Sequence, residues 1–267
     1  MKYGFIGAGN MVSAIVKGMT RSGNFSGADI LLCSKSTTSA QNLAKQCACQ
    51  ALDTAMAVAQ ESDVLVLGVK PQVLPVILPE LAPVIQQKKL LVLTLAAGKT
   101  LSWYVPYFGE DIPLIRVMPN INAKIGAACS GLCANEAATT AQTALAKEIF
   151  STIGSVHEIP ENQFSIFSVI GGASVAFAYL YMDALARAAV KAGMPKKQAL
   201  ELTAETVLGS AQMVLKSGEA PWVLIDQVCS PGGTTIEGIA ALEREAFSAT
   251  LTKAFDAVLE KDQRLGK

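Results

Sequence analysis

Short apolar runs rich in β-branched residues alternate with amphipathic stretches through the first 160 residues of this 267-residue chain. Such runs predict buried strands, and the stretches between them have helical periodicity. The strands are expected at residues 2–6, 29–33, 63–69, 90–95, 112–118, 127–133 and 153–158, and the helices at 10–22, 38–48, 53–60, 73–87 and 137–150. This alternation predicts an α/β fold with an N-terminal doubly wound (Rossmann-type) sheet.

The strand signals stop after Pro160. From Gln163 onward Ala, Leu, Met, Glu and Lys dominate, which predicts helices at residues 162–170, 173–192, 196–216 and 233–262. We therefore expect one domain over residues 1–160 and an all-helical C-terminal domain over residues 161–267. The helical domain has too few polar residues for the surface of a free domain, which predicts a homodimer or a higher oligomer of dimers.

Charge and composition exclude several classes of partner. The 22 Lys and Arg residues balance the 22 Asp and Glu residues, so there is no basic excess of the kind that binds nucleic acid or an anionic membrane. One apolar stretch, residues 172–192, is long enough to raise the question of a membrane span, but Asp183, Arg187 and Lys191 recur along it. We expect a cytoplasmic protein with a small-molecule partner.

The cysteines and the histidine argue against disulfides and metals. Six cysteines are dispersed through apolar surroundings, and their spacing does not form the double Cys-x-x-Cys pattern of a zinc site. The only histidine is His157. No metal site is predicted.

The first predicted strand runs into the loop Gly7-Ala8-Gly9-Asn10-Met11, which opens a helix. Gly7 allows a tight turn, and Gly9 lets a phosphate approach the backbone. The helix behind them offers free N–H groups and the positive end of its dipole. The segment therefore predicts a binding loop for the pyrophosphate of a dinucleotide, although Val12 occupies the place of the usual third glycine.

The end of the second strand indicates which dinucleotide binds. An acidic residue there would bind the ribose 2′-hydroxyl of NADH and repel the 2′-phosphate of NADPH. This chain has Ser34 and Lys35, followed by further hydroxyl residues, and no carboxylate. NADPH is the expected cofactor, with NADH as the alternative, although a merely solvated loop would have the same composition.

Three further segments follow predicted strands at the edge of the sheet where ligands of doubly wound folds bind. Val69-Lys70-Pro71 places a rigid, cationic turn there, and the small residues Ala97-Gly98 suit the approach of a nicotinamide ribose or close packing at a helix start. Asn120 could hydrogen-bond the nicotinamide or an imine substrate. Arg116, in the same segment, could instead serve a structural ion pair.

A different motif lies in the helical region. Ser230-Pro231-Gly232-Gly233-Thr234-Thr235 combines a proline turn, two glycines and two threonines directly before a predicted helix. Consecutive N–H groups at a helix start form a preformed anion site, which suits a substrate carboxylate. An ordinary threonine N-cap is the alternative interpretation.

Together these segments resemble the pyrroline-5-carboxylate reductase family, in the family's order and spacing and over essentially the whole chain. The motifs ending at Asn120 and at Thr235 are more specific than the glycine loop, because generic dinucleotide-binding proteins lack them. The resemblance implies reduction of 1-pyrroline-5-carboxylate to L-proline by hydride transfer from NAD(P)H. The chain departs from the family pattern at Ile121-Asn122, at residues 171–177 and at Gln227, all in the presumed substrate pocket.

The motifs and the resemblance predict a set of site residues. Thr235 is the expected catalytic residue, which hydrogen-bonds the imine nitrogen and helps to deliver a proton, while the N–H groups of Gly233 and Thr234 hold the carboxylate. The expected substrate-binding residues are Asn120, Val175, Gln227, Gly232, Gly233, Thr234 and Thr235, and the expected cofactor-binding residues are Gly7, Ala8, Gly9, Asn10, Met11, Ser34, Lys35, Val69, Lys70, Pro71, Ala97 and Gly98.

Two rival functions stay open. The first is a reductase of another small cyclic imine or of a hydroxy acid, for which Lys191 would have to reach the nicotinamide. The second is a non-catalytic nucleotide-binding sensor, which would bind the cofactor without oxidising it.

Overall fold

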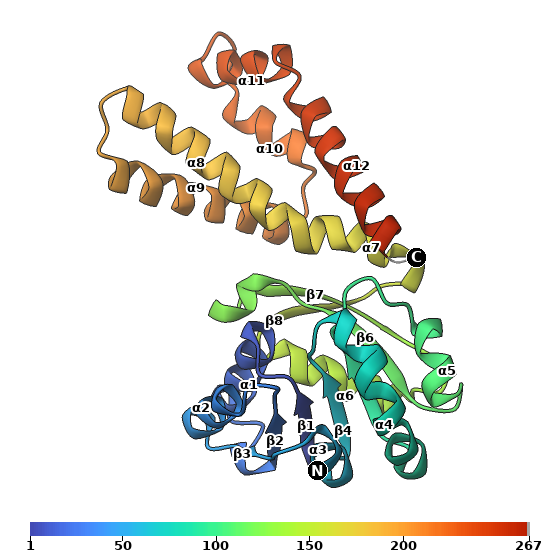
Figure 1. Ribbon diagram of the computed structural model, residues 1–267. Coiled ribbons are helices and arrows are strands. Elements are labelled where there is room, and N and C mark those ends of the chain that lie inside the picture. The colour runs from blue at the N-terminus through green and yellow to red at the C-terminus, as the bar shows by residue number, and fades with distance from the viewer. Residues whose placement is uncertain (266–267) are drawn as a thin grey trace. The chain divides into compact units, whose positions relative to one another are not determined.

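The computed structural model describes residues 1–265, and its packing divides the chain into two units (Figure 1). The first unit contains residues 1–172 and the end of the last helix from Lys261, and the second contains residues 173–260. By packing, residues 161–172 therefore belong with the α/β part of the chain. The functional boundary expected after residue 160 stays a prediction.

The first unit is built on one eight-stranded sheet in the order β3-β2-β1-β4-β5-β6-β7-β8. The strands are β1 (Tyr3–Ile6), β2 (Ile30–Cys33), β3 (Gln50–Ala51), β4 (Val64–Leu67), β5 (Leu91–Thr94), β6 (Leu114–Met118), β7 (Ala128–Ala134) and β8 (Gly154–Glu158). Neighbouring strands are parallel except β6 and β7, which are antiparallel. The strand order reverses between β1 and β4, which marks the switch point where doubly wound sheets bind their ligands.

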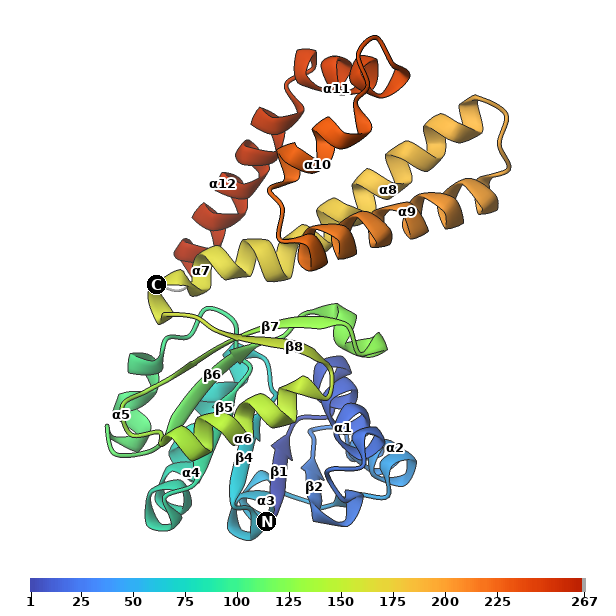
Figure 2. The ribbon, with the colours of Figure 1, turned by 180° about the vertical axis from the view of Figure 1, so that it is seen from behind.

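Helices cover both faces of this sheet, as the predicted fold class requires (Figure 2). The helices α1 (Asn10–Ser22), α2 (Thr37–Cys47) and α6 (Thr140–Ser151) pack on one face, and α3 (Ala55–Glu61), α4 (Leu74–Lys88) and α5 (Val105–Phe108) on the other. Every residue of β1, β2, β4 and β5 is buried, which explains why these strands are continuous apolar runs.

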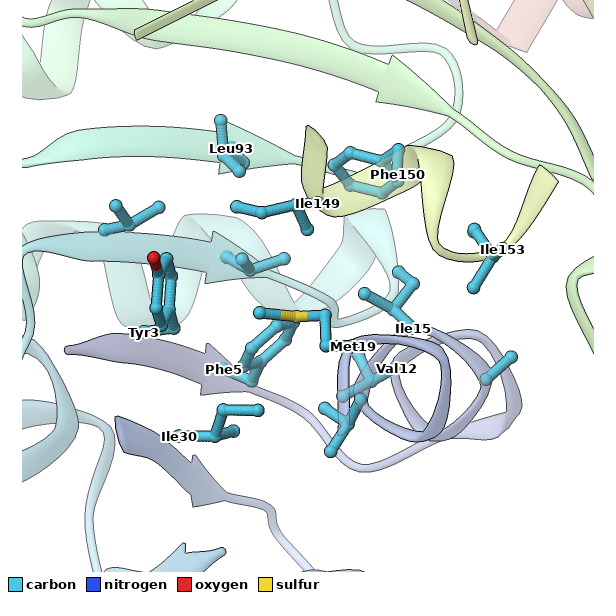
Figure 3. Close-up of a cluster of buried hydrophobic side chains, with 14 of the residues drawn as sticks. Tyr3, Phe5, Val12, Ile15, Met19, Ile30, Leu93, Ile149, Phe150 and Ile153 are labelled. Atoms are coloured by element: carbon cyan, nitrogen blue, oxygen red, sulfur yellow. The ribbon is translucent and has the colours of Figure 1, made fainter. Parts of the chain in front are cut away.

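One core cluster joins the sheet to the first-face helices (Figure 3). Phe5 of β1 and Leu93 of β5 contact this cluster together with Ile15 and Met19 of α1 and Phe150 of α6, and all five side chains are 0% exposed. Burial of one such side chain contributes about 1.5–3 kcal/mol. This packing fixes the start of α1 against the end of β1, where the glycine loop lies.

Short turns connect these elements and lead into the second unit. The 3₁₀ segments are η1 (Gly27–Asp29), η2 (Pro71–Val73), η3 (Leu101–Tyr104), η4 (Ile121–Ile125) and η5 (Glu161–Gln163), and α7 (Phe164–Phe167) is followed by one π-helical turn, Ser168–Ala173. A hydrogen bond of 2.9 Å from Ser168 Oγ to Asp262 Oδ1 ties this π-helical turn to the end of the last helix.

The second unit consists of helices: α8 (Ser174–Lys191), α9 (Lys196–Ser217), α10 (Pro221–Val228), α11 (Thr234–Arg244) and α12 (Phe247–Leu265), the last of which ends in the first unit. Two predictions for this region were wrong. Helix α10 was not predicted, and the helix expected over residues 233–262 is broken at Ala246, whose φ is 56°. The Ala246 N–H donates to the Glu243 carbonyl at 3.0 Å, which ends α11 without a glycine or proline to mark the site.

The second unit has almost no core of its own. Among residues 173–260, only Ala186, Ala199 and Thr203 are buried. Large apolar side chains are exposed instead, such as Leu180 at 70% and Leu215 at 84%. An exposed apolar surface of this kind indicates an interface with another protein surface.

By length and composition alone, one helical segment among the described residues, Glu161–Lys191, could cross a membrane. Weighing against this, α8 carries an ion pair between Arg187 and Asp183 with an N–O distance of 2.6 Å, one turn apart. A helix that packs against another protein surface, with its other side in water, would have both the apolar and the charged residues of α8.

Candidate active site

The glycine loop after β1 has the geometry of a phosphate-binding loop. Gly7 has a φ of +113°, and a Cβ at this position would lie 2.6 Å from the Gly68 carbonyl oxygen, so only glycine fits. A Cβ on Gly9 would meet nothing within 4 Å, which leaves open space above the backbone. No side chain caps α1, and its first turn has no acidic residue, so in the described structure its positive dipole end is uncompensated. These features fit a pyrophosphate.

Val12, at the place of the usual third glycine, is accommodated by a glycine elsewhere in the chain. Val12 is fully buried, and the residue opposite it is Gly68, directly after β4. A Cβ on Gly68 would lie 2.2 Å from Val12 Cγ2. The absence of a side chain at Gly68 therefore provides the space that a glycine at position 12 would otherwise provide, and α1 can still pack closely on the sheet.

The loop after β2 presents hydroxyl and cationic groups. Ser36 caps α2, since its side chain accepts a hydrogen bond from the Ser39 N–H. Ser34 is half-buried and Lys35 is exposed at the carboxyl edge of the sheet. Burial raises the pKa of the Cys33 thiol, at the end of β2, to about 11, so this thiol is neutral at physiological pH. The local groups are thus suited to binding a phosphate rather than to nucleophilic chemistry.

The loops after β4 and β5 line one cavity of about 400 Å³. Its lining residues are Pro71, Gln72, Pro75, Ala97, Gly98, Lys99 and Asp262. Gly98 has a φ of +72°, and Pro71 occupies the first position of η2 after the exposed Lys70. Val69 packs against the core beneath them. The structure therefore brings Pro71, Ala97 and Gly98 together around one cavity, whereas Val69 and Lys70 do not line it.

Asn120 braces the end of β6. It is 8% exposed, its Nδ2 donates to the Gly171 carbonyl at 2.8 Å, and its Oδ1 accepts from the Asn122 N–H at 3.1 Å. These bonds cap η4 and hold the π-helical turn Ser168–Ala173. Contact of Asn120 with the nicotinamide or the substrate stays a prediction, because its polar atoms already have partners within the protein.

Arg116 takes the structural role that was open in the sequence. Its guanidinium lies 3.4 Å from Glu161 Oε1 and 4.3 Å from the Phe164 ring centroid. The same Glu161 oxygen accepts a hydrogen bond from the Leu101 N–H at 2.6 Å. Arg116 thus links β6 to the segment that leads into the helical region.

The Ser-Pro-Gly-Gly-Thr-Thr motif lies at the start of α11. Gly232 has a φ of +67°, in the left-handed region that favours glycine, and a Cβ on Gly233 would lie 2.4 Å from Ser230 Oγ, so a side chain there would require the Ser230 side chain to move. The Gly233 N–H donates to the Ser230 carbonyl at 2.9 Å. This corrects one expected donor, since the closed turn uses the N–H that was assigned to the substrate carboxylate. Thr234 and Thr235, the first two residues of the helix, are exposed, and no side chain caps them.

The last two expected substrate-binding residues lie elsewhere in the second unit. Val175 is half-buried in the first turn of α8. Gln227 lines a mainly apolar cavity of about 540 Å³ between α9 and α10, together with residues such as Met213 and Leu224, and neither Thr234 nor Thr235 lines it. Sequence reasoning missed this cavity because α10 was not predicted.

Comparisons with known proteins match both parts of the chain. The model of NADP oxidoreductases, coenzyme F420-dependent, matches residues 2–97, and that of pyrroline-5-carboxylate reductase dimerisation matches residues 161–265. The pyrroline-5-carboxylate reductase of Escherichia coli is 37% identical over 266 residues, which cover 100% of this chain and 98% of that protein. The chain belongs to the pyrroline-5-carboxylate reductase family. The resemblance predicted from the motifs is thereby confirmed.

Solved structures agree with this family assignment. The pyrroline-5-carboxylate reductase from Coxiella burnetii has a TM-score of 0.94 and 32% identity, with 100% of this chain and 98% of that chain covered. The pyrroline carboxylate reductase from Plasmodium falciparum, solved with NADP bound, has a TM-score of 0.89 and 27% identity with the same coverage. The predicted fold class is therefore that of the pyrroline-5-carboxylate reductase family.

Proposed function

We propose that this protein reduces 1-pyrroline-5-carboxylate to L-proline by hydride transfer from NADPH, as the last step of proline biosynthesis in the cytoplasm. The observation that carries the proposal is the full-length match, in which an NADP oxidoreductase region and a reductase dimerisation region occur in one chain. The site agrees with it, because an electrophilic cyclic imine needs a positioned hydride donor and an anion-binding site rather than a metal or a nucleophile.

The cofactor residues divide by the part of the dinucleotide that they hold. We assign the pyrophosphate to the loop Gly7–Met11 and the start of α1, and the 2′-phosphate to Ser34 and Lys35. We assign the nicotinamide end to the cavity lined by Pro71, Ala97 and Gly98, next to Val69 and Lys70 in sequence, where small and rigid residues allow close approach. When bound there, NADPH supplies the hydride.

The substrate residues act through the start of α11. The N–H groups of Thr234 and Thr235, together with the dipole of the helix, bind the carboxylate. The Thr235 hydroxyl hydrogen-bonds the imine nitrogen and relays a proton to it from water. As the hydride adds to the imine carbon, the electrons of the C=N π bond move to nitrogen, and the product is the secondary amine of proline.

The choice of NADPH gives a testable consequence at Lys35. Lys35→Glu is expected to weaken NADPH binding at least tenfold more than NADH binding, because the new carboxylate repels the 2′-phosphate. Fluorescence titration with both cofactors measures the two dissociation constants. Lys45→Glu, which changes an exposed lysine in the last turn of α2, is the matched control. If Lys35→Glu weakened the binding of both cofactors equally, this loop would not be the binding site of the 2′-phosphate.

We also propose that the helical region forms a homodimer, in which the exposed apolar side chains of α8 are covered. Ala176→Glu combined with Leu180→Lys is expected to lower the particle mass seen by light scattering, because it places charges on a face where Leu180 is 70% exposed. Gln41→Glu, which creates the same charge spacing with Lys45 on α2, is expected to leave the mass unchanged. A monomeric unmutated protein would contradict the proposal.

The activity is tested by following NADPH oxidation with 1-pyrroline-5-carboxylate and with its 2-carboxylate isomer. Turnover with the 5-carboxylate in clear preference to its isomer is the expected result. Preference for the isomer would identify a reductase of another cyclic imine. Cofactor binding without oxidation of NADPH by either compound would favour the sensor.

A further inference from the structure

A further cavity lies beside the cofactor loop, along α1. It has a volume of about 260 Å³ and is lined by Asn10, Ser13, Ala14, Lys17, Arg21 and Lys124. Its volume is below the range of about 300–1,000 Å³ typical of drug-sized ligands and suits a compact group rather than a whole dinucleotide.

The basic residues that line this cavity are exposed and come from two elements. Residues 10, 13, 17 and 21 follow one another at helical spacing, so they form a single stripe along α1. Lys124 comes from η4, which packs against α1. The position of η4 is fixed by the Asn120 cap at its start and by Ala123, which is 1% exposed in the core.

Within the described part of the chain, these cations lack an acidic partner. Among residues 1–265, the ion pairs involve other side chains, and none includes Lys17, Arg21 or Lys124. Lys17 and Arg21 are four residues apart on one helix, an arrangement in which like charges repel. The chain as a whole has no net positive charge, so an excess of basic residues does not explain why these three lie together. An anion in the cavity would relieve this repulsion.

We propose that the cavity binds a compact multivalent oxyanion of the phosphate class. Lys17, Arg21 and Lys124 supply the positive charge, and the Asn10 and Ser13 side chains supply hydrogen bonds. Asn10 is also the first residue of α1 and a member of the cofactor loop. Because this places the oxyanion close to the pyrophosphate subsite, the two negative charges repel, and binding of either ligand weakens binding of the other. Only this coupling rests on the proposed function.

The test is calorimetric titration of inorganic phosphate into protein saturated with NADPH, at constant ionic strength set with chloride. Saturation with NADPH fills the cofactor's own phosphate subsites. We expect one saturable site, at least tenfold weaker in Lys17→Gln/Lys124→Gln and unchanged in Lys45→Gln/Lys196→Gln, which removes two exposed lysines elsewhere. Phosphate is expected to raise the dissociation constant of NADPH in the unmutated protein and in the control, but not in the cavity variant.

The outcomes separate the proposal from its rivals. No saturable binding, or equal binding in all three proteins, would overturn it. A loss of NADPH affinity in the cavity variant without phosphate that is as large as its loss of phosphate affinity would also overturn it, since the cations would then belong to the cofactor site. Titration with adenosine monophosphate separates two sources of the oxyanion: equal affinity indicates that a nucleotide phosphoryl group fits, and binding of phosphate alone restricts the site to the free ion. Reductase activity in phosphate-free buffer tests the proposed function independently.

Discussion

Replacement of Thr235 by valine is expected to lower kcat by a factor on the order of 10 to 1000, while NADPH affinity stays nearly unchanged. Valine keeps the shape of threonine and its backbone N–H but removes the hydroxyl that we assign to the imine nitrogen. The loss therefore falls on the transition state, in which the nitrogen gains electron density. Steady-state kinetics with saturating NADPH measure kcat and KM separately.

The neighbouring residue provides the control. Thr234→Val removes the hydroxyl of another exposed residue at the same helix start, but our mechanism uses only the backbone N–H of Thr234. It is expected to change kcat less than threefold. An unchanged kcat in Thr235→Val would refute the catalytic assignment. A large rise in KM alone would make Thr235 a binding residue and leave water as the proton source.

Gly68→Ala is expected to destabilise the protein by about 1–3 kcal/mol, the usual range for overpacking a core. The physical reason is that the new methyl group would lie 2.2 Å from Val12 Cγ2, which must then move together with the start of α1. NADPH binding is expected to weaken as well, because the glycine loop opens this helix. Urea unfolding gives the free energy, and cofactor titration gives the affinity.

The cause can be isolated with a double-mutant cycle. Val12→Ala alone also costs stability, because it leaves a cavity, but Val12→Ala with Gly68→Ala is expected to be more stable than the sum of the two single changes by at least 1 kcal/mol. Gly9→Ala is the matched control in the same loop, since its Cβ meets nothing within 4 Å, and its effect on stability is expected to stay below about 1 kcal/mol. Additive effects in the cycle would contradict the proposed compensation.

Much of the α/β part was predictable because its signals are local. The strands β1, β2, β4 and β5 are buried on both faces and therefore appear as continuous apolar runs, and α1 was predicted with its observed bounds. Strand β3 was missed, since it has only two residues, of which Gln50 is exposed. Local patterns are informative where burial is complete and the element is long.

The rest depended on contacts between residues that are distant in sequence. Asn120 was recognised as polar at a sheet edge, but its bond to the Gly171 carbonyl joins residues 51 positions apart. The space for Val12 of α1 is provided by Gly68, which follows β4 and is 56 positions away in sequence. The turn in which the Gly233 N–H donates to the Ser230 carbonyl depends on backbone geometry that cannot be predicted from the residue types. The same holds for the left-handed conformation of Ala246. Sequence therefore identified the site segments better than the partners of their atoms.

Because residues 173–260 have so few buried side chains, the stability of the folded protein depends on the protein concentration. With three buried side chains in that unit, most of its apolar area leaves water only upon association. Mass action then enters the free energy of unfolding: each tenfold dilution of a dimer lowers its stability by about 1.4 kcal/mol, whatever the sequence of the α/β unit. A melting temperature of this protein thus has a defined meaning only together with the concentration at which it was measured.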